Sequence, residues 1–220
     1  MSNRIKTFCC LALILSQSTD ADEYQFRVLS NSLEPLKNVV ISAGPALAEA
    51  PTGQEIMNQV NRKFAPYVLS VTQGQGVTFP NSDNVRHHVY SFSPAKMFEL
   101  KLYSGKPKAP ITFNELGTVV IGCNIHDNMV GYIYVTNKTY RATSDNTGKV
   151  NIVTQEFLSE VTLWHPNLSL DSQTELALKL SDLEQKDGIY QISLKIPTPN
   201  PDPQGVTNSA KDNFKQFIRD

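Results

Sequence analysis

The stretch GTVVIGCNIHDNMVGYIYV, residues 117–135, decides how this sequence is interpreted. Apolar and β-branched residues fill both of its ends, a composition typical of β-strands. Between these two runs lies a short loop with a thiol, an imidazole and a thioether, at Cys123, His126 and Met129. The stretch therefore predicts two neighbouring strands whose connecting loop gathers three side chains able to bind a soft or borderline metal ion.

The remainder of the chain has the same strand-like character. Short runs rich in Val, Ile, Thr, Tyr and Phe alternate with clusters of Gly, Pro, Asn and Asp, which indicates a β-sandwich or barrel. In the first part, strands are expected at 24–29, 39–42, 67–72, 76–79, 87–91, 109–114, 118–122 and 130–135. Residues 49–64 are expected to form the one internal helix or a long loop, which ends at Pro66.

A second, smaller β unit is expected from about Tyr140. ATSDNTGKVNIV predicts a turn with its tip at 146–148, followed by a strand, and EVTLWHPNLSL and GIYQISLKIP predict further strands. The fold class is therefore all-β, with a β-sandwich followed by a smaller sandwich-like unit. We expect residues 22–137 to form the first domain, 138–197 the small β domain, and 198–220 a Pro-rich linker and tail.

Residues 1–21 have the organisation of a secretory signal peptide. Arg4 and Lys6 precede the apolar run 8–15, and small and polar residues follow it. The apolar run is too short to cross a bilayer as a helix, although an anchor that stays attached is the alternative. The mature protein is therefore expected to be periplasmic or secreted, with no membrane association after cleavage.

The overall composition is that of a soluble globular protein. Charged residues make up 19% of the 220 residues, hydrophobic residues make up 40%, and the formal net charge is −1. No block of basic residues interleaved with aromatic residues is present, so nucleic acid is not expected as a partner.

Signal cleavage would leave Cys123 as the only cysteine, because Cys9 and Cys10 lie in the apolar run. A lone thiol in an exported protein is reactive, so something should protect it. One possibility is burial as an inert small hydrophobe. The other is metal ligation.

The donor set favours copper among the common metals. Calcium and magnesium prefer oxygen ligands, and structural zinc sites rarely include a thioether. A thiolate and two imidazoles in a trigonal plane, with a weak axial Met, form the blue-copper arrangement. The second imidazole is available from His87 or His88 at the start of a predicted strand, and only one of them can face the site because side chains alternate along a strand.

These residues resemble the cupredoxin family, with a ligand loop spaced as in amicyanin. The segments YVLSVTQGQGVTF, NSDNVRHHV and GTVVIGC resemble the family's strands around the first His and before the Cys, and the likeness covers about residues 65–137. It implies a Greek-key β-sandwich with one copper ion per chain. It also places His88 where the family has an Asn that braces the Cys loop. The ligands that the resemblance implies are His87, Cys123, His126 and Met129.

The whole mature chain is also similar to bacterial proteins of the "methylamine utilization" type. These pair a plastocyanin-like domain with a small β domain, which here resembles a carboxypeptidase-regulatory domain. The resemblance implies a monomeric, exported carrier of single electrons, with His126 as the electron port and a redox partner protein of unknown identity. The polar residues Asn124, Asp127 and Asn128 depart from the family's apolar docking patch.

Two other functions remain open at this point. The protein could buffer or deliver copper without redox turnover, or it could be a metal-free β-sandwich interaction module. An enzyme is not expected, because four histidines in all cannot supply the second copper cluster that copper oxidases and nitrite reductases need. Asn81 and Asp83 are expected to be turn-forming residues, His165 a surface or packing residue, and Trp164 part of the small domain's core.

Overall fold

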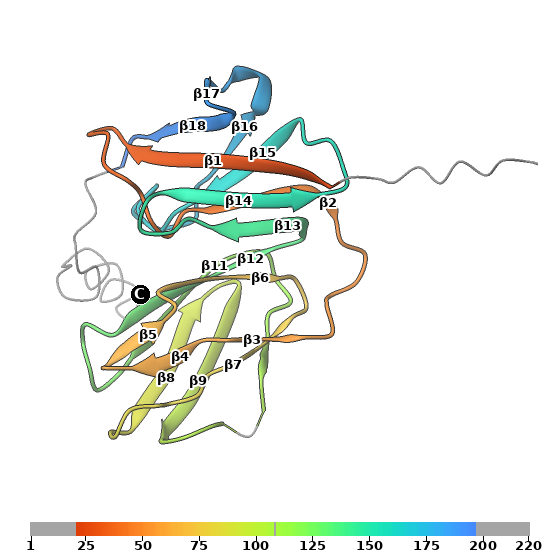
Figure 1. Cartoon of the computed structure of the whole chain (residues 1–220). Coiled ribbons are helices and arrows are strands. Elements are labelled where there is room, and N and C mark those ends of the chain that lie inside the picture. The colour runs from red at the N-terminus through yellow and green to blue at the C-terminus, as the bar shows by residue number, and fades with distance from the viewer. Residues whose placement is uncertain (1–20, 108, 197–220) are drawn as a thin grey trace, which may run out of the picture.

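The all-β prediction is confirmed. A computed structural model describes residues 21–107 and 109–196, and within them it contains eighteen strands, one 3₁₀ helix at Leu180–Asp182 and no α-helix (Figure 1). No helix in this described part could span a membrane. The predicted Pro-rich tail and all but the last residue of the predicted signal peptide lie outside the described residues.

The first unit, in the lower half of Figure 1, is a sandwich of a five-stranded and a three-stranded sheet. The larger sheet has the order β6 (Val68–Thr72), β12 (Val130–Thr136), β11 (Gly117–Cys123), β8 (His87–Ser93) and β9 (Lys96–Tyr103). The smaller sheet has the order β10 (Ile111–Thr112), β7 (Gly76–Thr78) and β3 (Gln54–Ile56). Every second side chain of these strands points inward, and together they form one core that includes Val77, Val89, Val119, Ile121 and Ile133.

Residues 49–64 contain strands where a helix or a long loop was expected, so the helix alternative is wrong. After β3, the hairpin strands β4 (Asn58–Val60) and β5 (Lys63–Ala65) pair with each other. Met57 and Gln59 are fully buried, whereas Ile56, the last residue of β3, is 56% exposed. This alternation has the period of a strand, and tertiary burial of the alternate side chains selects it over a helix.

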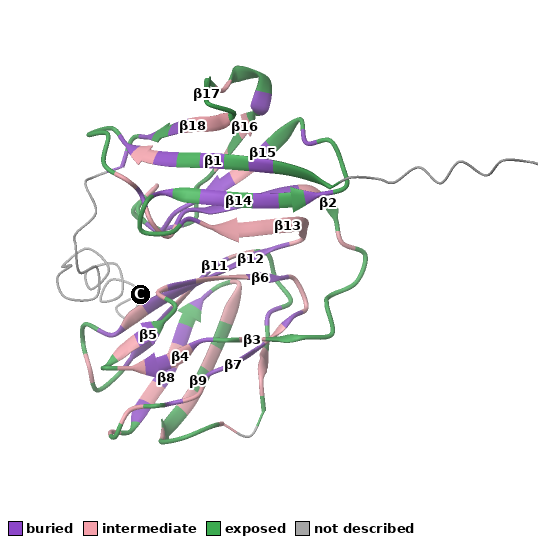
Figure 2. Ribbon diagram, in the orientation of Figure 1, coloured by how far each residue is buried: buried purple, intermediate pink, exposed green. Residues whose placement is uncertain are grey.

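The second unit, in the upper half of Figure 1, consists of two four-stranded sheets. One sheet has the order β14 (Lys149–Thr154), β1 (Asp22–Ser30), β18 (Ile189–Leu194) and β17 (Gln185–Lys186). The other has the order β13 (Lys138–Thr143), β2 (Val40–Ala46), β15 (Glu160–Trp164) and β16 (Glu175–Lys179). Buried and exposed residues alternate along β1 and β14 in Figure 2, because one face of their sheet covers the core between the two sheets.

Strand pairing assigns residues 22–46 differently from the expected division, which placed them in the first domain. β1 pairs with β14 and, in parallel, with β18, while β2 pairs with β13 and β15. The side chains of Phe26 and Val28 lie fully buried in the core of the second unit. The second unit is therefore discontinuous in the sequence. It contains β1 and β2, the strands from β3 to β12 form the first unit, and the second unit resumes at β13.

The two units pack closely against each other. Trp164 is fully buried, as expected, but it lies between the units rather than inside the second one: its ring stacks on that of Tyr134 with the centroids 5.1 Å apart. Its Nε1–H donates to the carbonyl oxygen of Ser172 at 2.7 Å. Arg141 on β13 reaches the first unit, donating to Thr72 Oγ1 at 2.7 Å and to Glu55 Oε1 at 3.0 Å.

Candidate metal site

Backbone hydrogen bonds within the loop after β11 fix its conformation. The N–H of Cys123 donates to the carbonyl of Met129 at 3.0 Å, and the N–H of Met129 donates to the carbonyl of His126 at 2.9 Å. β11 delivers Cys123 beside β8, because Cys123 and Val89 are paired residues of the two antiparallel strands. The two predicted ligand segments are therefore neighbours in one sheet.

The strand alternation on β8 decides which histidine faces the loop. His87 is fully buried and points toward Cys123, whereas the side chain of His88 is 17% exposed and pairs with Glu99 through Nε2 and Oε1 at 2.8 Å. His88 contributes to the loop only through its backbone, since its carbonyl accepts the N–H of Asn124 at 3.4 Å. His87 is thus the histidine placed to act with Cys123.

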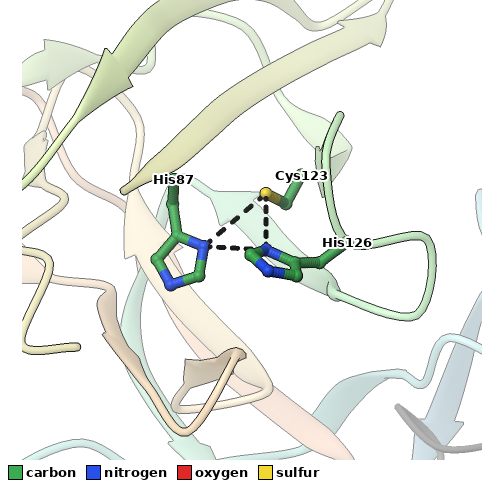
Figure 3. Close-up of side chains that lie close together, drawn as sticks. All are labelled: His87, Cys123 and His126. Atoms are coloured by element: carbon green, nitrogen blue, oxygen red, sulfur yellow. Dashed lines mark hydrogen bonds between the residues drawn. The ribbon is translucent and has the colours of Figure 1, made fainter. Parts of the chain in front are cut away.

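Three potential ligand atoms converge on one point (Figure 3). The Nδ1 atoms of His87 and His126 lie 3.1 Å apart, and Cys123 Sγ lies 3.7 Å from the first and 3.6 Å from the second. Cys123 is 4% exposed and His126 is half-buried, so only one imidazole lies near the surface. The structure therefore brings together three of the four predicted ligand residues.

Met129, the fourth predicted ligand, lies at the end of the same loop. It is 1% exposed and belongs to the same buried cluster as Cys123. Its role as an axial ligand stays a prediction. A buried Met at this place also fills core space.

Asp83 was expected to be a turn-forming residue, but its side chain instead contacts His87. Its Oδ2 lies 2.7 Å from His87 Nε2, on the side of the ring that faces away from Cys123. Asn81, by contrast, acts as the expected turn-former: its Oδ1 accepts the N–H of Asp83 at 3.0 Å. The i, i+4 spacing of Asp83 and His87 was the available signal, but in a loop that spacing alone does not imply contact.

The local electrostatics favour a neutral imidazole at the surface edge. Burial lowers the pKa of His126, and the charges of His87 and Arg62 lower it further, while Asp83 opposes the shift. At Asp83, burial alone would raise the pKa, but hydrogen bonds from the Arg62 N–H, His87 and the Asn61 N–H outweigh it, so the pKa lies below its ordinary value. Burial, followed by the negative charges of Cys123 and Asp127, raises the pKa of Tyr90 to about 12.

The three atoms fit a metal ion of the first transition series. Metal–nitrogen bonds of about 2.0 Å and metal–sulfur bonds of about 2.3 Å let one ion reach two donors that lie up to about 4 Å apart. All three separations, 3.1, 3.6 and 3.7 Å, are below that limit. One thiolate and two imidazoles are the equatorial donors of a blue-copper centre. Within the described residues, no other cluster of three or more His, Cys, Asp or Glu residues has this convergence.

Comparisons with known proteins give matches at the level of structure. No protein-family model matches the chain, and no curated protein matches it. Similar solved structures include a purple cupredoxin from Nitrosopumilus maritimus, with 24% identity, a TM-score of 0.33, and coverage of 40% of this chain and 100% of that one. An oxidized mutant of amicyanin has 24% identity, a TM-score of 0.35, and coverage of 45% and 99% respectively.

A copper-containing nitrite reductase from Thermus scotoductus is also similar, with 24% identity and a TM-score of 0.36. The match covers 50% of this chain but 28% of the reductase. With TM-scores below 0.5, these likenesses carry no functional conclusion for this chain.

Proposed function

We propose that this protein is a blue-copper carrier of single electrons, with one copper ion per chain. The observation that supports it is the triangle of His87 Nδ1, Cys123 Sγ and His126 Nδ1, three atoms that lie within 3.7 Å of one another. Copper bound at these atoms would supply the chemistry by alternating between Cu(II) and Cu(I). Met129 is the proposed weak axial ligand, at the end of the loop that Cys123 begins.

The protein's part is to hold the donors in place. Cys123 is anchored at the end of β11 and His87 at the start of β8, and these two strands are hydrogen-bonded to each other. Because both strands are fixed in one sheet, the side chains of Cys123 and His87 have little freedom to move. The positions of these ligands would therefore change little between the oxidised and the reduced site. Binding requires the Cys123 thiol to lose its proton and both imidazoles to present an unprotonated Nδ1.

His126 is the proposed route for the electron, because it is the half-buried member of an otherwise buried ligand set. Three of its neighbours, Asn124, Asp127 and Asn128, are exposed and polar, and the fourth, Ile125, is an exposed apolar side chain. This mixed surface suits a transient rather than a permanent contact with a redox partner. Residues 1–21 are the proposed signal peptide, which places the mature monomer in the periplasm or outside the cell. The protein has no proposed enzymatic activity.

The visible absorption spectrum of the purified protein, titrated with Cu(II), tests this proposal. We expect an intense thiolate-to-copper band that saturates at about one equivalent and is bleached by reductant. Cys123→Ser should abolish the band because the serine hydroxyl cannot replace the thiolate. Met129→Leu should retain it, because the two imidazoles and the thiolate remain, and the folded protein should lose less than about 1.5 kcal/mol of stability.

Two alternatives predict different outcomes of this titration. The exposed polar loop around His126 favours a copper-handling protein, which would show the band but exchange electrons slowly between its own oxidised and reduced forms. A metal-free interaction module would show no band at all. In that case Cys123→Ser would leave the protein's properties unchanged.

A further inference from the structure

The carboxylate of Asp83 lies directly behind the ligand His87. Its Oδ2 is 2.7 Å from His87 Nε2, and the two side chains are 10% and 0% exposed. We propose that Asp83 is a positioning residue that holds His87 with Nδ1 toward Cys123 and His126, and that its negative charge lowers the reduction potential of the bound copper. This inference rests on the proposed function.

A tight turn fixes the carboxylate from the other side. Asp83 Oδ1 accepts the N–H of Asn61 at 2.6 Å, and Oδ2 accepts the N–H of Arg62 at 2.8 Å. Asn61 and Arg62 are the two central residues of the β4–β5 hairpin, with φ angles of 54° and 57°. Positive φ at both positions defines a type I′ turn, which here aims two consecutive N–H groups at one carboxylate.

This anchoring determines which nitrogen of His87 can bind the metal. An ionised carboxylate only accepts hydrogen bonds, so Nε2 of His87 must carry the proton that it donates to Asp83. Nδ1 is then left with its lone pair, and Nδ1 is the atom that lies 3.7 Å from Cys123 Sγ. The hydrogen bond thus selects the tautomer and the ring orientation that the site needs.

The charge of Asp83 has a second effect. A carboxylate bound to the far nitrogen makes the imidazole a stronger donor. Stronger donation and nearby negative charge both stabilise Cu(II) more than Cu(I), because Cu(II) carries the larger charge. The reduction potential therefore falls.

The chain contains its own matched control for this arrangement. His88, the next residue on β8, forms the same kind of pair with Glu99, with Nε2 and Oε1 2.8 Å apart. That pair lies on the opposite face of the strand and does not belong to the cluster of potential ligands. Glu99→Gln therefore makes the same chemical change as Asp83→Asn, but without touching a ligand.

The test compares copper affinity and reduction potential in the wild-type protein, Asp83→Asn and Glu99→Gln. Loss of such a supporting hydrogen bond weakens metal binding by about 10- to 100-fold. If Cu(II) binding weakens about tenfold more than Cu(I) binding, the potential of Asp83→Asn rises by about 59 mV. Glu99→Gln should leave both quantities nearly unchanged. Equal shifts in the two variants, or no shift in either, would overturn the proposal.

A second measurement uses only the wild-type protein, so its result does not depend on whether a variant folds. In the Cu(I)-loaded wild-type protein, ¹H–¹⁵N spectra should show a slowly exchanging His87 Nε2–H that is hydrogen-bonded to a carboxylate. Rapid exchange of that proton with water would overturn the proposed orientation. A wild-type protein without the thiolate-to-copper band would instead refute the proposed function itself, so the two failures are distinguishable.

Discussion

At the scale of single residues, the sequence predicted which side chains come together in the loop, but not the contact between Asp83 and His87. Cys123, His126 and Met129 lie close together in the sequence, so their spacing already places them in one loop. His87 followed from strand alternation together with the resemblance to cupredoxins. The role of Asp83 depends on a turn at Asn61 and Arg62, far earlier in the chain, and local sequence does not encode which distant turn a carboxylate meets.

His165 provides a residue-scale prediction on pH. It is 4% exposed, and burial lowers its pKa to about 4, although a hydrogen bond with the Lys37 backbone opposes the shift. Below its unfolded pKa of about 6.5, the unfolded chain binds a proton that the folded protein does not. The stability from neutral His165 is therefore complete above about pH 6.5 and is lost as the pH falls toward about 4, by up to about 1.4 kcal/mol per pH unit.

Urea unfolding of the metal-free protein from pH 7 to pH 4.5 would measure this contribution. His165→Asn removes the titrating group while keeping an acceptor for the Asn167 N–H, which now donates to His165 Nδ1 at 3.1 Å. We expect a flatter pH dependence of the unfolding free energy in the variant. Parallel pH profiles for the two proteins would contradict the assignment.

At the scale of elements, strands with a clear apolar alternation were predicted, whereas the polar edge strand β9 and the two-residue strand β17 were not. The predicted strands at 67–72, 118–122 and 130–135 correspond closely to β6, β11 and β12. β9 was missed because it lies at the edge of its sheet and carries charged side chains on its outward face. The two-residue strand β17 depends on its pairing partner rather than on its own composition, whereas β10 lies within the strand expected at 109–114.

The predicted turn at 146–148 was confirmed, and it allows a sharp test. Gly148 has a φ of +75°, and a side chain there would collide with the carbonyl oxygen of Val28. Gly188 in the β17–β18 turn has a φ of +77°, but a side chain there would meet open space. Gly148→Ala should therefore cost more than about 2 kcal/mol, whereas Gly188→Ala should cost only the backbone strain of about 1 kcal/mol.

Thermal unfolding of the two glycine variants would compare these costs directly. The two substitutions add the same methyl group at nearly the same φ, so the difference between them measures the collision alone. Equal losses of stability would mean that the β13–β14 turn moves away from Val28 without cost.

At the scale of the whole molecule, the fold class was predicted and the path of the chain was not. Periodicity indicates that β1 and β2 are strands, but it does not indicate which strands they join. Their partners β13, β14, β15 and β18 come after the entire first unit in the chain. Such long-range pairing is set by how complete sheets bury their apolar faces, and it cannot be obtained from a local window of sequence.

The contact between the two units predicts cooperative unfolding. Trp164 is the only tryptophan of the chain and lies between the units, so its fluorescence reports on their separation. We expect its thermal transition to coincide with that of the far-ultraviolet circular dichroism.

Arg141→Met removes the hydrogen bonds to Thr72 and Glu55 and should lower the free energy of unfolding by about 1–3 kcal/mol.

The exposed Arg27 on β1 offers a control for Arg141, because Arg27→Met makes the same substitution away from the contact between the units. It should change stability by less than about 0.5 kcal/mol. A tryptophan transition well below the circular dichroism transition in the wild-type protein would show that the units separate before they unfold.

The parallel pairing of β1 with β18 has a consequence for biosynthesis. As the chain emerges from the ribosome, β1 and β2 come out before any of their partners. β13 and β14 follow only after the entire first unit, and β18 comes later still. The sheet that carries Cys123 is already complete when β12 has emerged at Thr136. The loop from Cys123 to Met129 can therefore form during translation, while the apolar faces of β1 and β2 stay uncovered and depend on chaperones. A nascent chain stalled before Lys138 would hold His87, Cys123 and His126 in a complete sheet, while β1 and β2 still lack every partner and are prone to aggregate.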